Sequence, residues 1–145
     1  VMQVRHKAFF HALRQAGLST EPTLARSSLY IDKCMGTHLP RLLDMGVSAV
    51  ICCHDQMANA AVLKCQQLGY HVPKDISIIG FDDLPFCAYT SPPLTTIRQD
   101  RIQLGKSAYY ALDSLMNQVS IGTLLLHAQL IVRNSTGKVP IKEEI

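Results

Sequence analysis

The sequence predicts an α/β fold with a mostly parallel, doubly wound sheet. Helical and extended segments alternate along the 145 residues and are joined by short turns. The apolar runs 47–53 and 76–81 are continuous rather than alternating, as expected for strands that are buried on both faces. Cys52 and Cys53 would point to opposite faces of the first run, which favours helices on both sides of the sheet.

The first part of the chain predicts a helix, a strand and a second helix. Apolar residues recur at helical spacing over 1–16, and 24–30 has the composition of a strand. The second helix is expected over 32–44, with Asp32 as its N-cap. Pro40 either lies awkwardly inside this helix or marks its true first turn, because proline lacks the backbone N–H that a helix interior needs.

The remainder predicts a βα unit followed by further strands and one more helix. Asp55 starts the helix of that unit, and Gly69 ends it. Ser91-Pro92-Pro93 stiffens the chain, either as a crossing between two lobes or as a rigid surface turn. The other elements expected are a strand at 47–53, a strand at 76–81, an extended piece at 94–97, a helix at 99–117, a strand at 125–133 and an exposed end from 134 onward.

Composition is that of a folded domain. Hydrophobic residues make up 48% of the chain and charged residues 17%, and the length corresponds to about one domain. No apolar run approaches the roughly 18 residues of a membrane span, so no membrane partner is expected. The amphipathic first helix does not resemble a signal peptide. The net charge of +3 comes from scattered residues, which does not indicate a nucleic-acid surface on this chain.

The cysteines indicate a reducing compartment. Their number is odd and they form no C-x-x-C pair, which argues against a disulfide framework or a zinc site. We expect small buried hydrophobic side chains in a cytoplasmic protein, with no metal or cofactor. The five residues are Cys34, Cys52, Cys53, Cys65 and Cys87.

Two carboxylates follow the strand at 76–81. Asp82 and Asp83 would stand at the carboxyl edge of the sheet, where open α/β folds bind ligands. Both could instead cap nearby backbone amides in an Asx turn. The position of the two residues leaves both roles open for Asp82 and Asp83.

Several motifs, in this order along the chain, resemble the effector-binding region of the lactose/galactose repressor family of bacterial transcription regulators. The matching segments are R-H-K-A-F at 5–9, C-C-H-D-Q-M-A-N-A-A-V-L at 52–63, L-G-Y-H-V-P-K-D-I-S-I-I-G-F-D-D at 68–83, P-P-L-T-T-I-R-Q at 92–99, L-G at 104–105 and L-I-V-R-N-S-T at 130–136.

The resemblance implies a type I periplasmic-binding-protein-like fold, in which two doubly wound lobes close around a small effector. Residues 1–91 and 125–136 would form most of the carboxyl-terminal lobe, and 94–118 would cross into the amino-terminal lobe. Most of that other lobe and a DNA-binding head would lie outside this chain. The implied partners are a small-molecule effector, expected to be a sugar, a second copy of the chain, and operator DNA contacted through the head.

The resemblance also implies which residues bind the effector. Arg5 matches the arginine that hydrogen-bonds the effector, since a planar fork of donors fits vicinal hydroxyls or carboxylates. Asp82 would accept bonds from effector hydroxyls, and Tyr30 could stack on a sugar ring. His54 stands where the family most often has asparagine. An imidazole can donate or accept one hydrogen bond when neutral, so His54 either contacts the effector or makes no contact at all.

Dimerisation in the family uses the helix at 55–68 and the loop at 84–90. The interface residues expected here are Met57, Ala61, Phe86 and Tyr89. The chain is thus interpreted as the effector-sensing and dimerisation part of a transcription regulator, expected to be a repressor and not an enzyme. The alternatives are a periplasmic sugar receptor of a transport system and, more remotely, an acid/base enzyme using His54 and Asp82.

Overall fold

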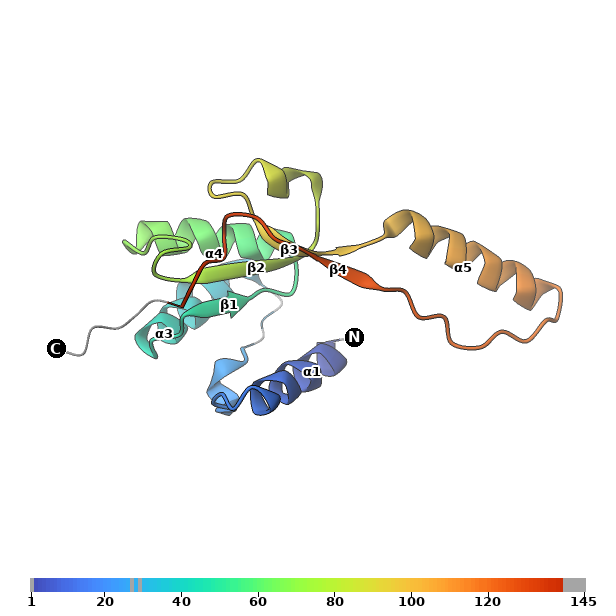
Figure 1. Cartoon of the computed structure of the whole chain (residues 1–145), viewed down its shortest axis with the longest axis horizontal. Coiled ribbons are helices and arrows are strands. Elements are labelled where there is room, and N and C mark those ends of the chain that lie inside the picture. The colour runs from blue at the N-terminus through green and yellow to red at the C-terminus, as the bar shows by residue number, and fades with distance from the viewer. Residues whose placement is uncertain (1, 27, 29, 140–145) are drawn as a thin grey trace. The chain divides into compact units, whose positions relative to one another are not determined.

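A computed structural model describes residues 2–26, 28 and 30–139 of the chain (Figure 1). It divides into two compact units, Val1–Gly46 and Val47–Ile145. The first unit is helical and the second contains the sheet. The two units are described in turn.

The first unit begins with the expected helix, α1 (Met2–Gln15). Gly17 follows at a φ of +67°, a left-handed conformation that ends the helix and that glycine adopts without steric cost. The short helix η1 (Pro22–Leu24) comes next, and after it α2 (Ile31–Lys33), η2 (Cys34–His38) and α3 (Leu39–Asp44) follow one another directly.

The strand expected at 24–30 is not formed. Among its described residues, 24–26, 28 and 30, Leu24 ends η1 and none belongs to a strand. The Ala25 N–H instead donates to the Pro22 carbonyl at 3.3 Å, a local turn bond. A strand needs a neighbouring strand to pair its backbone groups, and the described residues of this segment are not part of the four-stranded sheet. The apolar composition of the segment was therefore misleading.

The second helix accommodates Pro40 through a π-helical turn. A proline removes one helical hydrogen bond and its ring clashes with the carbonyl four residues back, here that of Gly36. In η2 the ladder widens, and the Leu39 N–H donates to the Cys34 carbonyl five residues back. The wider turn carries the chain past the proline without ending the helical segment.

The N-cap of this segment differs from the prediction. Tyr30 is the N-cap of α2 and makes no side-chain capping bond, whereas Asp32 lies within the first helical turn. An acidic side chain there is still favourable because the amino-terminal end of a helix carries a partial positive charge.

The second unit contains a four-stranded sheet in the order β1-β2-β3-β4. The strands are β1 (Ala49–Ile51), β2 (Ser77–Asp82), β3 (Thr95–Gln99) and β4 (Ala128–Ile131). β1, β2 and β3 are parallel, and β4 runs antiparallel to β3, which confirms a mostly parallel sheet. β1 is shorter than expected, and Ile51 is 57% exposed because β1 is the edge strand.

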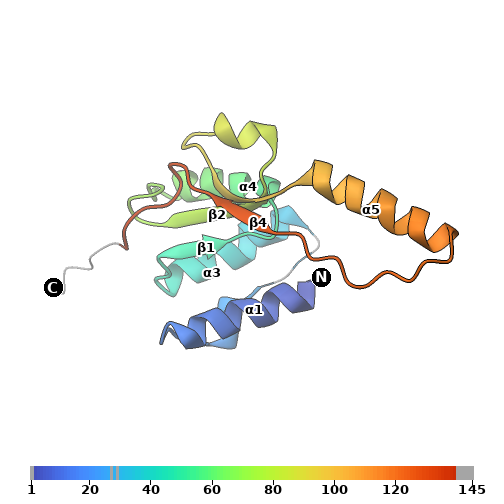
Figure 2. The same ribbon diagram turned by 45° about the vertical axis from the view of Figure 1, so that its right-hand side comes forward.

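Helix α4 (Asp55–Gln67) connects β1 to β2 and packs against β2, as both views show (Figures 1 and 2). Gly69 ends it at a φ of +84°. Its inner face is built from small or branched side chains, so the helix can approach the sheet closely. The buried side chains on this face include Ala58, Ala61, Val62 and Cys65. Ala61 is fully buried and offers no surface to a second chain, so its assignment to a dimer interface is replaced by a core role.

Four of the five cysteines are buried and Cys53 is half-buried, which confirms that they serve as small core residues.

The end from 134 onward, expected to be exposed, is tied to the core through Ser135, while residues 134 and 137–139 are exposed. Ser135 is fully buried. Its Oγ donates to the Ile78 carbonyl at 2.6 Å and accepts from the Thr95 N–H at 2.8 Å. The Ile78 N–H donates to the Ser135 carbonyl at 2.8 Å. The segment thus links β2 to β3 through buried polar groups, which explains why a polar R-N-S-T sequence can stand inside the domain.

Asp55 connects four parts of the second unit. Its carboxylate is fully buried, accepts from the Thr96 hydroxyl of β3 at 2.5 Å, and accepts from the Leu84 N–H at 2.7 Å. A Cβ atom on Gly80 of β2 would collide with Asp55 Oδ1. Glycine at position 80 is therefore required for the carboxylate to lie between α4 and the sheet.

Asp83 forms the second buried anchor. It accepts from Arg98 Nε at 2.6 Å and from Arg133 Nη2 at 2.8 Å. Burial by itself would raise the pKa of Asp83, but the hydrogen bonds from Arg133 and Arg98 outweigh burial, and the pKa lies below its usual value. Arg133 also donates to the Leu94 carbonyl at 2.8 Å, so the cluster joins the ends of β2, β3 and β4.

Replacing Gly80 with alanine should destabilise the second unit by about 1 to 3 kcal/mol, because the added methyl group overlaps the buried carboxylate. Urea denaturation measures the loss. Gly105→Ala is the matched control, since nothing lies within 4 Å of a Cβ there and the residue is inside a helix. Equal stability of the two variants would contradict the packing role of Gly80.

Stability should depend on pH through Asp83. Because the folded-state pKa of Asp83 is lowered, the ion cluster contributes fully above the unfolded-state pKa of about 3.9 and loses its contribution as pH falls through the lower folded-state pKa. Asp83→Asn should cost about 3 kcal/mol at neutral pH and flatten the acid limb of the stability curve. Unfolding free energies measured from pH 2 to 7 test this, and an unchanged acid limb would exclude the role.

Candidate functional site

The carboxyl ends of β1 and β2 bring two of the predicted site residues to one edge of the sheet (Figure 1). Ile51 is paired with Ile79 in the parallel register, so His54 and Asp82 each follow by three positions. Both are half-buried, so each retains accessible surface. This is the edge at which parallel sheets bind ligands.

His54, rather than Asp55, is the N-cap of α4. Its Nδ1 accepts from the Met57 N–H at 3.1 Å. An imidazole nitrogen that accepts carries no proton, so the neutral ring has its proton on Nε2. The position therefore presents one donor, Nε2–H, which is also what an asparagine amide can offer to an effector oxygen.

Asp82 is held in an unusual conformation. Its φ of +111° is rare for a residue with a side chain, and such conformations concentrate at functional sites. Its Oδ1 accepts from Gln99 Nε2 at 3.1 Å. In the part of the chain that the structure describes, this is the one side-chain bond to the carboxylate, which leaves Oδ2 as an acceptor.

Gln99 is a site residue that the sequence analysis missed. It ends β3, the strand that follows β2 in the sheet, and is half-buried. The rule that selected Asp82, a polar residue at the carboxyl end of a parallel strand, would also have selected Gln99.

Asp83 does not belong to this site. Its two carboxylate oxygens are engaged by Arg98 and Arg133, as described above. Two hydrogen bonds anchor the loop that follows Asp83. The Leu84 N–H donates to the Asp55 carboxylate, and the Leu94 N–H donates to the Cys87 carbonyl at 2.8 Å. On this loop Phe86 is half-buried and Tyr89 is 88% exposed.

The buried thiols near the site are not suited to nucleophilic chemistry. Burial, supported by the hydrogen bond that the Cys87 thiol donates to the Asp55 carboxylate, raises the pKa of Cys87 to about 12. Burial raises the pKa of Cys65 to about 11. Both thiols stay protonated near neutral pH, and the thiolate is the reactive form.

The other predicted effector residues lie in the first unit. Arg5 is on α1 and is half-buried, and Tyr30 is 71% exposed at the start of α2. The structure therefore brings His54, Asp82 and Gln99 together within the second unit, while Arg5 and Tyr30 belong to the unit before it.

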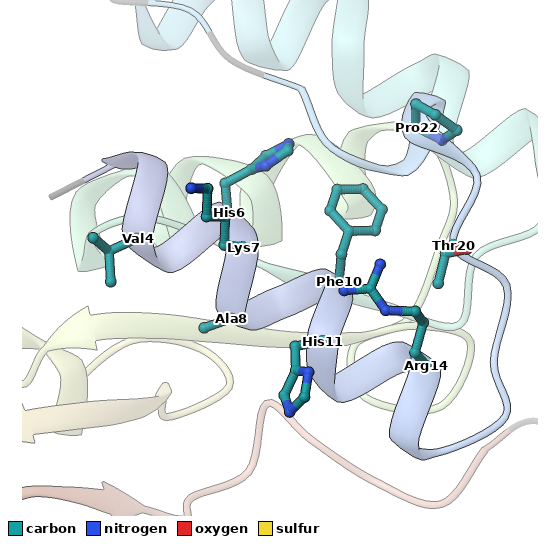
Figure 3. A pocket seen from close by; sticks show the side chains of 9 residues that line it. All are labelled: Val4, His6, Lys7, Ala8, Phe10, His11, Arg14, Thr20 and Pro22. Atoms are coloured by element: carbon teal, nitrogen blue, oxygen red, sulfur yellow. The ribbon is translucent and has the colours of Figure 1, made fainter.

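A hollow of about 730 Å³ lies along α1 in the first unit (Figure 3). Its lining contains the basic residues Lys7 and Arg14 and no acidic residue. Arg5 does not line it, so this hollow is distinct from the predicted effector residues. The lining residues are Val4, His6, Lys7, Ala8, Phe10, His11, Arg14, Thr20 and Pro22.

Residues 2–26, 28 and 30–139 present neither a metal site nor a membrane span. No group of three or more histidine, cysteine, aspartate or glutamate side chains is arranged there to hold a metal ion. Within the same ranges, no helix is both long enough and apolar enough to span a bilayer.

Comparison with known proteins identifies the domain. The family model described as a periplasmic binding protein-like domain matches residues 1–136. The chain is 37% identical over 135 residues to the HTH-type transcriptional regulator MalR of Streptomyces coelicolor, which covers 87% of this chain and 38% of that protein. It is 34% identical over 140 residues to the HTH-type transcriptional repressor CytR of Escherichia coli strain K12, which covers 94% of this chain and 41% of that protein.

Solved structures agree. The transcription regulator CcpA of Lactococcus lactis superimposes with a TM-score of 0.80 at 27% identity, over 89% of this chain and 48% of that one. The lac repressor bound to ONPG in the repressed state gives a TM-score of 0.79 at 27% identity, over 92% of this chain and 41% of that one. The chain spans less than half the length of each of these four proteins. It belongs to the periplasmic binding protein-like domain family, in the form carried by lactose/galactose-repressor-type transcription regulators.

Proposed function

We propose that this chain is the effector-sensing and dimerisation part of a DNA-binding transcription regulator that responds to a sugar or another hydroxyl-rich metabolite. The effector would favour one arrangement of two lobes, and that arrangement would set the spacing of two attached DNA-binding heads. Such coupling requires that the effector bind the two arrangements with different affinities.

The observation that carries the proposal is the state of Asp82. A half-buried carboxylate in a left-handed-region conformation, with one oxygen bound by Gln99, stands at the carboxyl edge of a parallel sheet, the edge that also carries His54. A carboxylate acceptor on the same edge as a neutral donor suits a ligand whose hydroxyl groups both donate and accept. We also propose Arg5, with its charged donors, as an effector-binding residue, as the family resemblance implies.

The surface of helix α5 (Arg101–Met116) supports the assignment of 94–118 to a second lobe. None of its residues is buried, although many are large and apolar. Exposed apolar surface of this extent indicates a covering partner, and in a two-lobe protein that partner is the rest of the amino-terminal lobe. The exposed apolar residues are Ile102, Leu104, Tyr109, Tyr110, Leu112, Leu115 and Met116.

Accessible side chains on α4 and on the loop after β2 support a two-fold dimer contact. Tyr89 is almost fully exposed, and Phe86 and Met57 are half-buried, so each has surface to offer. A self-complementary contact between copies would bury these side chains. Ala61 takes no part because it is buried within its own chain.

The two alternatives are less well supported. A periplasmic transport receptor would share the fold, but the relatives compared above are transcription regulators, and five cysteines without a pairing pattern suit the cytoplasm. An acid/base enzyme of this kind would need His54 as its acid or base, whereas His54 Nδ1 is occupied by the bond from the Met57 N–H. A relative solved with cellobiose, the regulator CelR, also favours a sugar effector over a reaction.

Effector binding tests the proposal in the full-length protein. D-glucose, D-galactose, D-ribose, cellobiose and adenosine are screened by thermal shift, and the compound with the largest shift is titrated by calorimetry. Arg5→Ala and Asp82→Ala should each weaken its binding by about 1.5 to 3 kcal/mol, as expected for a lost hydrogen bond to a charged group. Arg41→Ala and Asp44→Ala, at exposed positions of α3, are the matched controls. Unchanged affinity in both site variants would exclude the site.

Self-association tests the dimer. Tyr89→Lys should shift the full-length protein from dimer toward monomer in sedimentation velocity, because a charge would have to be buried in the contact. Leu18→Lys places the same charge at an exposed position outside the proposed contact and should leave the dimer intact. A dimer that dissociates in neither variant would contradict this interface.

A further inference from the structure

We propose that the hollow along α1 binds a phosphorylated small molecule, a sugar phosphate or a nucleoside monophosphate, at a site separate from the candidate effector site. The hollow is lined only by residues of the first unit, whereas His54 and Asp82 belong to the second. The inference therefore does not rest on the proposed role of Asp82. It adds to the chain a second ligand site, through which a second metabolite would act on the regulator.

The hollow has the size of a small-molecule site. Its volume is about 730 Å³, and ligand pockets in proteins enclose roughly 300 to 1,000 Å³. Its wall comes from α1 and from the turn after it, which contributes Thr20 and Pro22 (Figure 3). All the lining residues lie within 4–22, so the hollow forms inside one unit.

The lining of the hollow is basic. Lys7 and Arg14 are exposed and line it together with no acidic residue, and α1 contains no aspartate or glutamate. In the part of the chain that the structure describes, neither Lys7 nor Arg14 forms an ion pair. Arg98 and Arg133, by contrast, are both paired with Asp83. An anionic ligand is therefore the complementary occupant of the hollow.

Phosphate is the anion that these side chains favour. The guanidinium of Arg14 offers donors in a planar fork that matches two phosphate oxygens, and Lys7 adds a compact charge. The hydroxyl of Thr20 is a further donor in the lining. Arg14 also lies in the last turn of α1, where a basic residue stabilises the helix. That structural role alone gives no affinity for phosphate esters, so binding distinguishes the two roles.

An aromatic cluster supplies an apolar wall. The rings of His6 and Phe10 meet edge to face with their centroids 4.9 Å apart, and Phe9 and Phe10 do so at 5.2 Å. His6, Phe10 and Arg14 are spaced four residues apart and so lie on one face of α1. In Figure 3 these side chains extend toward the side on which Pro22 lies. Rings and a cation on one face suit a ligand that joins a phosphate to a sugar or base ring.

Calorimetric titration of the full-length protein tests the inference. Glucose-6-phosphate and AMP are titrated, and inorganic phosphate, glucose and adenosine serve as the separate parts of the two esters. At least one ester should bind at least about tenfold more tightly than inorganic phosphate, because its ring adds contacts to the aromatic wall. Tighter binding of glucose-6-phosphate assigns a sugar phosphate, and tighter binding of AMP assigns a nucleotide. Equal affinity for inorganic phosphate and both esters, or no binding of either ester, would overturn the inference.

Two single substitutions locate the site. Lys7→Gln and Arg14→Gln should each weaken binding of the ester about tenfold, because each removes a hydrogen bond to a charged group. Both residues are exposed, so neither change removes core packing. Lys33→Gln and Arg41→Gln, at exposed positions of the same unit outside the lining, are the matched controls. The same affinity in site and control variants would contradict the assignment.

Asp82→Ala separates this inference from the proposed function. An ester bound along α1 should keep its affinity in that variant, because Asp82 is outside the lining. Loss of ester binding in Asp82→Ala, with no change in Lys7→Gln and Arg14→Gln, would overturn the inference and support the candidate effector site instead. If no sugar in the earlier screen binds while the ester responds to both basic residues, the proposed effector site fails and the site along α1 stands.

Discussion

The buried carboxylate of Asp55 is the interaction on which the second unit depends. An unpaired carboxylate inside a protein is strongly unfavourable, so each of its oxygens must find a donor. Here one oxygen accepts a hydrogen bond from the Thr96 hydroxyl of β3, and the other accepts one from the Leu84 backbone N–H. Because Asp55 is itself the first residue of α4, a single side chain fixes a helix, a strand and the loop after β2 relative to one another. A side chain at position 80 would overlap this carboxylate, so the position requires glycine.

The edge of the sheet uses aspartates in three separate ways. Asp55 satisfies backbone and hydroxyl donors, Asp83 neutralises two arginines, and Asp82 keeps one accepting oxygen at the surface. The three aspartates have the same side chain and differ in their hydrogen-bond partners. Two anchored carboxylates hold the loop and the strand ends rigidly, so the third can be presented in a strained conformation. A binding site of this kind is precise because its neighbours have no freedom to adjust.

Histidine in place of asparagine at position 54 changes the hydrogen bonding of the candidate site less than the difference between an imidazole and an amide would suggest. The ring is fixed by its bond from the Met57 N–H, and so its remaining nitrogen serves as a donor. The imidazole caps α4 at the edge of the sheet where we propose that the effector binds.

The sequence by itself determined the fold class, the family and most helix and strand positions, because continuous apolar runs, glycine stops and the ordered motifs are local signals. It also located His54 and Asp82, since residues at the carboxyl ends of parallel strands share an edge. It failed at 24–30, where an apolar segment found no strand to pair with, and at Ala61, whose burial depends on how α4 packs. Only the tertiary structure could decide that Ser135 enters the core, that His54 rather than Asp55 caps α4, and that Gln99 holds Asp82. These features depend on contacts between residues far apart in sequence or on the direction of side chains. Neither produces a periodic pattern in the sequence.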